Sequence, residues 1–217
     1  MNLILLGPPG AGKGTQAKML SNNLNIPHLS TGEILRQMIL KNDDLGKSLN
    51  KIMTKGLLVS DDMINEIVEN RINLDDCKTG FILDGFPRTI NQATSLESSL
   101  KNQSKKLDKV IQIDVPNEIL IKRIMGREVC VDCATIYNKF FDPLPVKGCK
   151  KCGSKKKPYV RKDDDEISFK NVRLKKYNDE TKPLIDYYQN VNLLKSFDGT
   201  EQITEIGKKI IKYLKNI

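Results

Sequence analysis

The residues most able to do chemistry form a glycine-rich loop at 7–15, which reads GPPGAGKGT. The loop follows an apolar run at 2–6 and precedes a stretch with helical periodicity at 13–24. Glycines let backbone N–H groups turn inward around phosphates, the following helix presents its positive end, and a lysine at this spacing reaches the β- and γ-phosphate oxygens. We therefore predict a nucleoside triphosphate site. Its residues are Gly10, Ala11, Gly12, Lys13, Gly14 and Thr15.

Arginines that could surround a transferred phosphate recur along the chain. Phosphoryl transfer needs alignment of donor and acceptor, and positive charge around the transferred group. Arginine suits this role because its guanidinium stays charged and presents forked donors. A single arginine is equally compatible with a solvated surface cation, but the set indicates an anionic substrate. The candidates are Arg36, Arg88, Arg123, Arg127, Arg161 and Arg173, of which Arg123 and Arg127 fall on one face of a helix.

Four cysteines in two C-x-x-C pairs indicate a metal site. Cys130, Cys133, Cys149 and Cys152 have zinc-ribbon spacing, with 15 residues between the pairs. Four thiolates with no open position predict a structural Zn²⁺ that stabilises a module too small to build its own core. Iron in the same sulfur site and four unliganded thiols are the alternatives. The fifth cysteine, Cys77, is interpreted as a small buried residue.

Alternating apolar and helical segments indicate how these residues are positioned. Alternation predicts a parallel sheet covered on both faces, with ligands at the carboxyl ends of the strands. The strands are expected at 2–6, 26–29, 80–84, 109–115 and 192–197. The helices are expected at 13–24, 31–41, 60–73, 89–101, 116–126, 166–190 and 202–216. Residues 127–162, rich in Lys, Cys, Gly and Pro, interrupt the alternation and predict a small inserted β-rich module.

These segments together resemble a known family. GPPGAGKGTQ at 7–16, STGEILR at 30–36, GLLVSD at 56–61 and DGFPR at 84–88 resemble, in order, the motifs of adenylate kinases, and the likeness covers essentially the whole chain. Gly14 holds the Ser/Thr place of the general motif G-x-x-x-x-G-K-[ST], but Gly-Thr after the lysine is the family's own pattern. The resemblance implies an α/β, P-loop NTPase-like fold with a five-stranded parallel sheet, helices on both faces and a zinc-ribbon lid insertion.

The resemblance also implies how AMP is held. Guanidinium groups clamp its phosphate, apolar residues hold the adenine, and Gln92 hydrogen-bonds the adenine edge. The implied AMP-binding residues are Thr31, Arg36, Leu57, Leu58, Val59, Gly85, Phe86, Pro87, Arg88, Gln92, Arg161 and Arg173. On the residues alone, we expect Ser30 or Thr31 to cap one helix and Ser60 or Asp61 the next.

On the donor side, the resemblance implies that Arg127, Ile136, Tyr137 and Glu201 join the glycine loop around ATP. Mg²⁺ accompanies ATP, with Asp84 orienting its bound water. The implied catalytic residues are Lys13, Asp84, Arg88, Arg123, Arg127, Arg161 and Arg173. No general base is needed because the AMP phosphate is already anionic, so the only histidine, His28, is interpreted as structural.

The spacing between two of these arginines departs from the family pattern. Arg161 and Arg173 are one residue further apart than usual, and Val172 occupies the position that strict spacing would give to the arginine. We assign the role to Arg173 because Arg-Leu followed by KPLIDYY at 182–188 aligns with the family from there on.

We therefore expect a Mg²⁺-dependent kinase that converts ATP and AMP into two ADP. The chain 1–217 is interpreted as a core at 1–29, 60–125 and 164–217, an AMP-binding segment at 30–59 and a zinc lid at 126–163. Closure of both flaps is expected to exclude water. The alternatives are a related nucleoside monophosphate kinase with another donor or acceptor, such as a GTP:AMP phosphotransferase, and a nucleic-acid-binding zinc ribbon on a degenerate scaffold. Intact Lys13, Asp84 and Arg88 argue against the second.

Bulk composition limits the partners. The net charge of +9, from 36 Lys and Arg against 27 Asp and Glu, fits a polyanionic partner, which we expect to be nucleotides and not nucleic acid. No apolar run reaches the 18 or more residues that span a bilayer. Because 2–6 is interpreted as a core strand, no targeting segment is expected, and we expect a cytoplasmic monomer without membrane contact.

Overall fold

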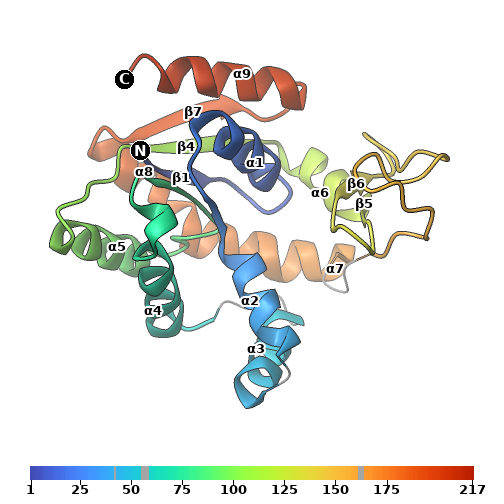
Figure 1. Cartoon of the computed structure of the whole chain (residues 1–217), viewed down its shortest axis with the longest axis horizontal. Helices are drawn as coiled ribbons and strands as arrows, with labels where there is room; N and C mark the ends of the chain where they lie inside the picture. Colours follow the sequence, from blue (N-terminus) through green and yellow to red (C-terminus); the bar gives the residue numbers. More distant parts are fainter. Residues whose placement is uncertain (42, 55–58, 161–163) are drawn as a thin grey trace.

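The computed structural model describes residues 1–41, 43–54, 59–160 and 164–217, and its centre is a five-stranded parallel sheet (Figure 1). The strand order is β2-β3-β1-β4-β7. The strands are β1 (Asn2–Leu6), β2 (His28–Ser30), β3 (Phe81–Asp84), β4 (Lys109–Asp114) and β7 (Leu194–Asp198). The predicted α/β sheet is confirmed, and each strand lies within two residues of its expected bounds.

Alternate side chains of the strands enter two different cores, as the period of a β-strand requires. In β1, Ile4 and Leu6 belong to one core, whereas Leu3 and Leu5 belong to the other. Each fully buried aliphatic side chain of this size stabilises the fold by about 1.5–3 kcal/mol. Helices therefore cover both faces of the sheet, as predicted. The first core is closed by α4 (Asp61–Ile72), α5 (Ile90–Asn102) and α8 (Pro183–Asn190), and the second by α1 (Lys13–Leu24) and α9 (Ile203–Leu214).

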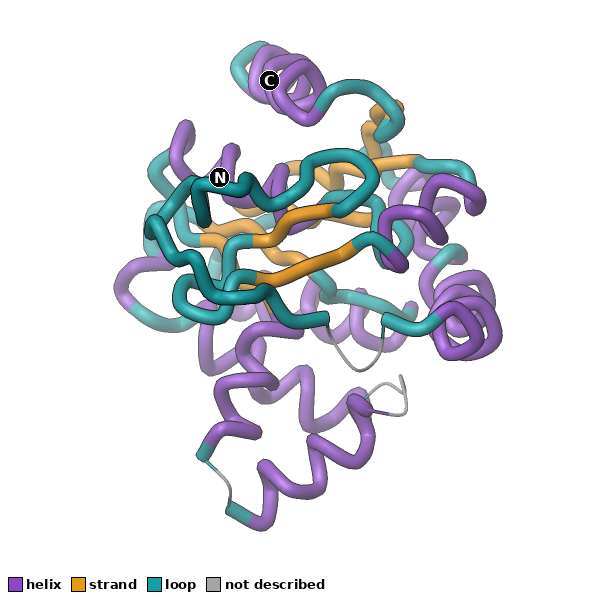
Figure 2. The backbone as a smooth tube through the Cα atoms, turned by 90° about the vertical axis from the view of Figure 1, so that its right-hand side faces the viewer, coloured by secondary structure: helices purple, strands orange, loops and turns teal. Residues whose placement is uncertain are grey.

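Most helices agree with the sequence prediction. They are α1 (Lys13–Leu24), α2 (Thr31–Leu40), α4 (Asp61–Ile72), α5 (Ile90–Asn102), α6 (Asn117–Met125), α8 (Pro183–Asn190) and α9 (Ile203–Leu214), with a short 3-10 turn η1 (Asp75–Cys77). One further helix, α3 (Asp44–Thr54), was not predicted, although Leu45, Leu49, Ile52 and Met53 have the i, i+4, i+7, i+8 spacing of an amphipathic helix. It packs on α2, and both project below the body of the molecule (Figures 1 and 2).

The helix predicted at 166–190 differs from a regular α-helix. It begins as α7 (Glu166–Ser168) and continues as two π-helical segments, η2 (Phe169–Leu174) and η3 (Tyr177–Thr181), before α8. A π-turn closes hydrogen bonds over five residues instead of four, which apolar periodicity in a sequence does not reveal.

The predicted insert is a small module built mainly of loops, which faces the viewer in Figure 2. Strand β5 (Arg127–Val129) pairs antiparallel with β6 (Ile136–Asn138), and Val129 also bridges to Tyr159. Among the described residues, its hydrophobic cluster has three buried members, Cys130, Tyr137 and Cys149. A module this small needs an additional cross-link, which agrees with the expectation of a metal.

The side-chain caps expected for α2 and α4 are not formed. Ser30 and Ser60 occupy the N-cap positions of α2 and α4, but neither side chain makes a capping hydrogen bond. The Thr31 hydroxyl instead donates to the carbonyl of Gly85 at 3.0 Å. Asp61 accepts hydrogen bonds from Thr89, Asn91 and Gln92 at the start of α5. Thr31 and Asp61 therefore connect separate segments of the chain.

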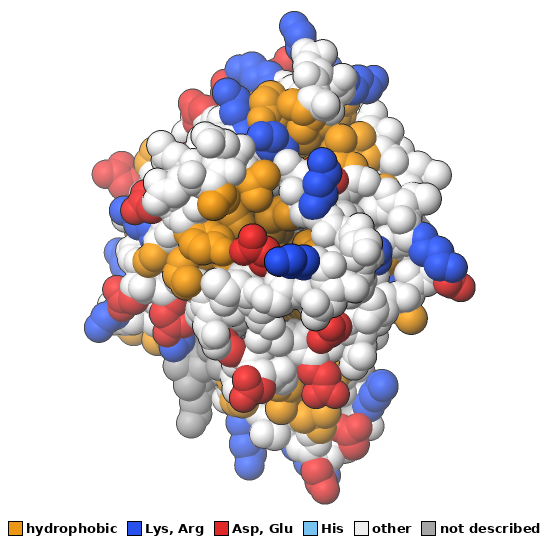
Figure 3. All heavy atoms as spheres, turned by 90° about the vertical axis from the view of Figure 1, so that its left-hand side faces the viewer, with side chains coloured by type: hydrophobic (Ala, Val, Ile, Leu, Met, Phe, Trp, Pro, Cys, Tyr) orange, Lys and Arg blue, Asp and Glu red, His pale blue; other side chains and the backbone are white. Residues whose placement is uncertain are grey.

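Charges of both signs are interspersed on the face opposite the insert (Figure 3). The insert, by contrast, carries a run of lysines at 147–157. Within the described residues, no helix combines the length and apolar character needed to cross a membrane.

Candidate functional site

The glycine loop connects β1 to α1 and is closed around its own lysine. Gly10 and Gly12 have φ angles of 89° and 95°, which side chains rarely adopt. A β-carbon on Gly10 would also lie 3.1 Å from Ile124 Cγ1. Lys13 Nζ donates to the carbonyls of Gly7 and Pro8 at 2.7 and 3.0 Å. The loop therefore places the ammonium at the N-terminal end of α1, where the helix dipole favours an anion.

Asp84, at the carboxyl end of β3, faces this loop from the neighbouring strand. Its side chain is buried, and a β-carbon on Gly14 would lie 3.3 Å from its Oδ2. Serine or threonine at position 14 would crowd the carboxylate, so glycine in this place is explained by the approach of Asp84. His28 Nε2 lies 3.2 Å from Asp84 Oδ2, which sequence analysis did not anticipate. This contact and nearby Lys13 hold the pKa of Asp84 below its ordinary value despite burial, so the group is a carboxylate.

The residues after Asp84 bring a second cation to the same edge. The backbone of Gly85 has a φ of 83°, and a β-carbon there would lie 2.9 Å from Thr31 Oγ1. Arg88 Nε donates to the carbonyl of Gly85 at 2.7 Å, so the guanidinium folds back toward the strand end. Burial lowers the pKa of Arg88, with Asp84 opposing. Arg36 lies further out on α2, where its guanidinium pairs with Glu33 at 2.9 Å.

Gln92 is held rigidly behind Arg88. Its side chain is buried, its Oε1 accepts from the Arg88 backbone N–H at 2.7 Å, and its Nε2 donates to Asp61 Oδ1 at 2.6 Å. Thr89 also donates to Asp61, at 2.9 Å. An amide side chain has two donors and two acceptor sites, so one of each remains beyond these contacts.

Two arginines share one buried carboxylate beside the glycine loop. Arg127 Nε donates to Asp164 Oδ2 at 2.6 Å and its Nη2 to Oδ1. Arg173 Nη1 donates to Asp164 Oδ1 at 3.1 Å. The side chain of Asp164 is fully buried, so both guanidinium groups are oriented by strong charge-assisted bonds. Sequence analysis did not select Asp164.

These cations surround Lys13 closely enough to change its acidity. Burial lowers the pKa of Lys13 to about 8; Asp84 opposes this shift, and the positive charges of Arg88, Arg173 and Arg127 add to it. Asp84 and three arginines from separate elements therefore act electrostatically on Lys13 at the carboxyl edge of the sheet. Such a cluster can bind polyphosphate and stabilise negative charge on a transferred phosphoryl group.

The pH dependence of activity should report this environment. The ammonium form of Lys13 is the one that can neutralise phosphate, and it is lost as pH rises through about 8. We expect kcat/KM for the nucleoside triphosphate to fall above that pH, because this ratio reports the free enzyme. Bound phosphate favours the ammonium, so kcat should hold to higher pH. Initial rates measured between pH 6.5 and 10 check this. A flat kcat/KM across that range would contradict it, and Lys13→Arg should remove the alkaline limb.

Arg123 connects the glycine loop to a second loop. Its Nη1 donates to the carbonyl of Ala11 at 3.3 Å and its Nη2 to that of Gly199 at 2.8 Å. The second loop follows β7 and is held by Asp198, which accepts from the N–H and hydroxyl of Thr200 at 2.8 and 2.7 Å. The Glu201 side chain pairs with Lys209 at 2.6 Å, so its backbone is what remains available to a nucleotide. Thr15, in the first turn of α1, is exposed.

The four predicted metal ligands come together in the insert. The sulfurs of Cys130, Cys133, Cys149 and Cys152 all lie within 4.8 Å of one another, with 3.7 Å between Cys130 and Cys152 and 3.5 Å between Cys133 and Cys149. A tetrahedron with Zn–S distances of about 2.3 Å has edges of about 3.8 Å. The thiols therefore fit a four-coordinate Zn²⁺. Tyr137, whose hydroxyl donates to Cys149 at 3.2 Å, lowers the pKa of that thiol to about 5, which favours the thiolate that a metal requires.

The two insert residues assigned to ATP point in different directions. Tyr137 is buried beside the cysteines, so its side chain belongs to the core of the insert. Ile136 is 45% exposed and offers an apolar surface.

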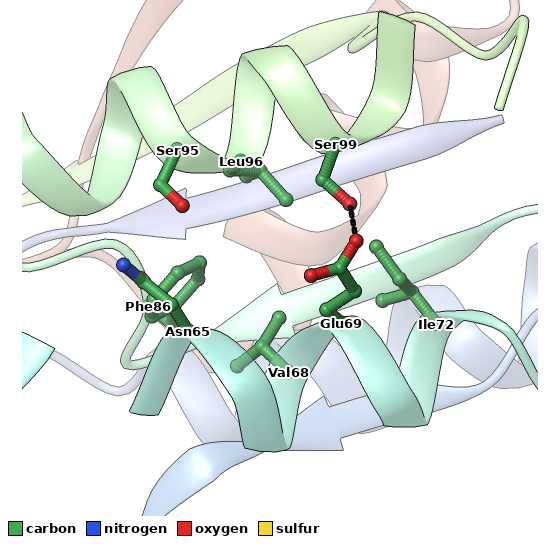
Figure 4. A pocket seen from close by; sticks show the side chains of 8 residues that line it. All are labelled: Asn65, Val68, Glu69, Ile72, Phe86, Ser95, Leu96 and Ser99. Carbon is green, nitrogen blue, oxygen red and sulfur yellow. Dashed lines mark hydrogen bonds between the residues drawn. The ribbon is translucent and has the colours of Figure 1, made fainter. Parts of the chain in front are cut away.

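Three predicted residues, Arg161, Leu57 and Leu58, lie outside the described part of the chain. Val59 and Phe86 lie in the core between the sheet and α4, and the Phe86–Pro87 peptide is cis. Behind Phe86 a cleft between α4 and α5 is bordered by a hydrogen bond of 2.8 Å between Ser99 and Glu69 (Figure 4). Its volume of about 10 Å³ suits one water molecule, so it is not a nucleotide site.

Comparisons with known proteins agree with this geometry. A family model described as adenylate kinase matches residues 5–193. The chain is 47% identical over 215 residues to an adenylate kinase of Caldicellulosiruptor saccharolyticus, with 99% of each chain covered. It is 48% identical over 218 residues to an adenylate kinase of Clostridium acetobutylicum, with both chains fully covered, and 46% identical over 215 residues to one of Clostridium tetani, covering 99% of this chain and 98% of the relative. The protein is therefore a phosphotransferase that belongs to the adenylate kinase family.

Proposed function

We propose that this protein transfers the γ-phosphoryl group of ATP to AMP reversibly, giving two ADP, with Mg²⁺ bound to ATP. The observation that carries the proposal is the meeting of Lys13, Asp84, Arg88, Arg127 and Arg173 at one edge of the sheet, between two loops that follow parallel strands. The curated relatives named above carry the name adenylate kinase, which supports the same activity.

In this proposal each charged group has a defined task. Lys13 and the loop N–H groups hold the β- and γ-phosphates, and Arg36 and Arg88 hold the AMP phosphate. An AMP phosphate oxygen attacks the γ-phosphorus while ADP leaves, and Arg123, Arg127, Arg161 and Arg173 stabilise the charge on the oxygens between them. Mg²⁺, when bound, neutralises phosphate charge, and the buried carboxylate of Asp84 fits the role of orienting its water ligands.

We assign the residues around the two nucleotide bases, the metal and the segments of the chain on the same grounds. AMP adenine is held by Val59, Leu57, Leu58 and Gln92, with Thr31, Gly85, Phe86 and Pro87 beside it. ATP is covered by Ile136 and by the backbone at Tyr137 and Glu201. We further propose Zn²⁺ in the cysteine cluster, a core at 1–29, 60–125 and 164–217, an AMP-binding segment at 30–59, a lid at 126–163, and a cytoplasmic monomer. Closure of both flaps would exclude water and prevent hydrolysis of ATP.

A panel of nucleotides tests the proposal. ATP or GTP is offered as donor, and AMP, UMP, CMP or GMP as acceptor, in a coupled assay of product formation. We expect the highest kcat/KM for ATP with AMP, and tight binding of two adenosines bridged by five phosphates. Faster transfer from GTP would favour the GTP:AMP alternative. No transfer to any acceptor, together with binding to single-stranded nucleic acid, would favour the zinc-ribbon alternative.

Substitution of Arg36 tests AMP binding separately from ATP binding. Its side chain is 37% exposed on α2 and contacts only that helix among the hydrogen bonds of the described residues. We expect Arg36→Ala to raise KM for AMP about 10–100-fold, as for loss of a charge-assisted bond, with KM for ATP unchanged. Arg36→Lys should be intermediate, because it keeps the charge but loses the forked geometry. Steady-state kinetics with each substrate varied check this, and equal changes in both KM values would contradict it.

A further inference from the structure

The helix that carries Arg173 contains two turns wider than those of an α-helix. In η3, the N–H of Lys182 donates to the carbonyl of Tyr177, five residues back, at 2.8 Å. In an α-helix the partner lies four residues back. Segments of this kind are rare and occur frequently at functional sites. The first of them, η2, includes Arg173 itself.

The wide turn η2 places two residues five positions apart on the same side of the helix. Phe169 and Leu174 are both buried, and both belong to the core that contains Leu120 and Ile124 of α6. In an α-helix, with 3.6 residues per turn, residues five apart point about 140° away from each other. Only one of the two side chains would then reach that core. The wide turn therefore allows both contacts.

The same turn decides which residue faces the phosphate site. The guanidinium of Arg173 lies 3.1 Å from Asp164 and 5.9 Å from the ring centre of Phe169. Val172, in contrast, lines a shallow outer hollow together with Lys175 and Lys176. Position 172 therefore faces away from Asp164, whereas position 173 faces it.

We propose that η2 is a register-correcting turn: it accommodates one residue more than an α-turn between Phe169 and Leu174, and thereby keeps Arg173 at the phosphate site. This rests on the proposed role of Arg173 in phosphoryl transfer. Four α-helical residues rise about 6 Å and bring side chains four apart onto one face. Removing one residue from the outer side of η2 would thus let an α-turn join the same two buried anchors.

Removal of Asn171, which is exposed on that outer side, tests the proposal. We expect kcat within about threefold of the wild type and a Tm raised by about 2–4 °C, the size of shift that one relieved local defect produces in a chain of this length. Asn171→Ala, which keeps the length, should change neither. Insertion of alanine after Asn171 should lower kcat as strongly as Arg173→Ala does. The proposal is overturned if shortening abolishes activity in a folded protein, or if the insertion is tolerated.

A second variant keeps the backbone length and decides the matter if shortening prevents folding. The exchange Val172→Arg/Arg173→Val should lose activity like Arg173→Ala, about 100-fold or more, because position 172 faces outward. Full activity of the exchanged protein would mean that the turn rewinds freely, and would overturn the proposal.

A stability readout separates this inference from the function of Arg173. Arg173→Ala should lower Tm, because it removes one partner of buried Asp164, and the same decrement should appear in the protein shortened at Asn171. If Arg173→Ala leaves kcat unchanged, the catalytic assignment fails, yet equal decrements would still support the register-correcting turn. Unequal decrements would overturn it.

Discussion

Replacement of Lys13 by methionine should lower kcat by about 10³-fold without lowering Tm. The ammonium sits at the N-terminal end of α1 among Arg88, Arg127 and Arg173, where it neutralises charge that develops on phosphate oxygens. Removing one preorganised donor of this kind costs about 10²–10³-fold, and loss of the full charge places Lys13→Met at the upper end. Because burial disfavours the ammonium in the folded protein, an apolar chain of similar length should keep or raise Tm.

Lys18 provides the matched control for this prediction. It lies on the same helix α1 but is exposed to solvent. Lys18→Met should leave kcat and both KM values unchanged. Rates from a coupled assay and Tm from calorimetry check both variants. A Lys13→Met protein with more than about a tenth of the wild-type kcat would contradict the role assigned to the lysine.

Loss of one cysteine of the proposed zinc site should be the most damaging change to stability. Cys130→Ser leaves three thiolates in a module whose buried cluster contains few residues, so little else holds the module together. We expect a Tm lower by about 10 °C or more, and transfer of phosphoryl groups that persists at low temperature. A strong zinc chelator should lower the Tm of the wild type similarly, with little further effect on the variant.

Cys77 is the control, because it is buried but lies far from the cluster in the sequence, beside Arg71. Cys77→Ala should retain one zinc per chain by elemental analysis, whereas Cys130→Ser should not. If Cys130→Ser abolished activity at low temperature in a protein that stays folded, the metal would have a role in the reaction and not only in stability.

The fold could be predicted largely because strands and glycine loops have local signals. The run NLILL before GPPGAGKGT fixes both a buried strand and the loop that follows it. The two C-x-x-C pairs likewise predict a metal site from their spacing alone. Wide turns have no such signal: the apolar residues between 166 and 190 suggest a helix, but only the packing of Phe169 and Leu174 against α6 selects π-turns.

Contacts between distant segments account for most of what the sequence could not show. His28 was interpreted as structural from its place at a strand end, yet parallel pairing of β2 with β3 brings it to Asp84. Asp164 was not selected, because its two partners lie 37 and 9 residues away along the chain. Ser60 or Asp61 was expected to cap α4, and Asp61 instead holds Gln92. In each case the hydrogen-bond partner of a polar side chain can be identified only from the folded structure.

The carboxylate of Asp164 has a consequence for substrate entry. It is itself an anion, and it already occupies the guanidinium groups of Arg127 and Arg173. Asp164 therefore orients both guanidinium groups before an anionic substrate arrives. Binding then does not have to cost the conformational entropy of either arginine side chain. An anionic substrate that contacts these arginines would therefore compete with the carboxylate of Asp164 for their N–H donors.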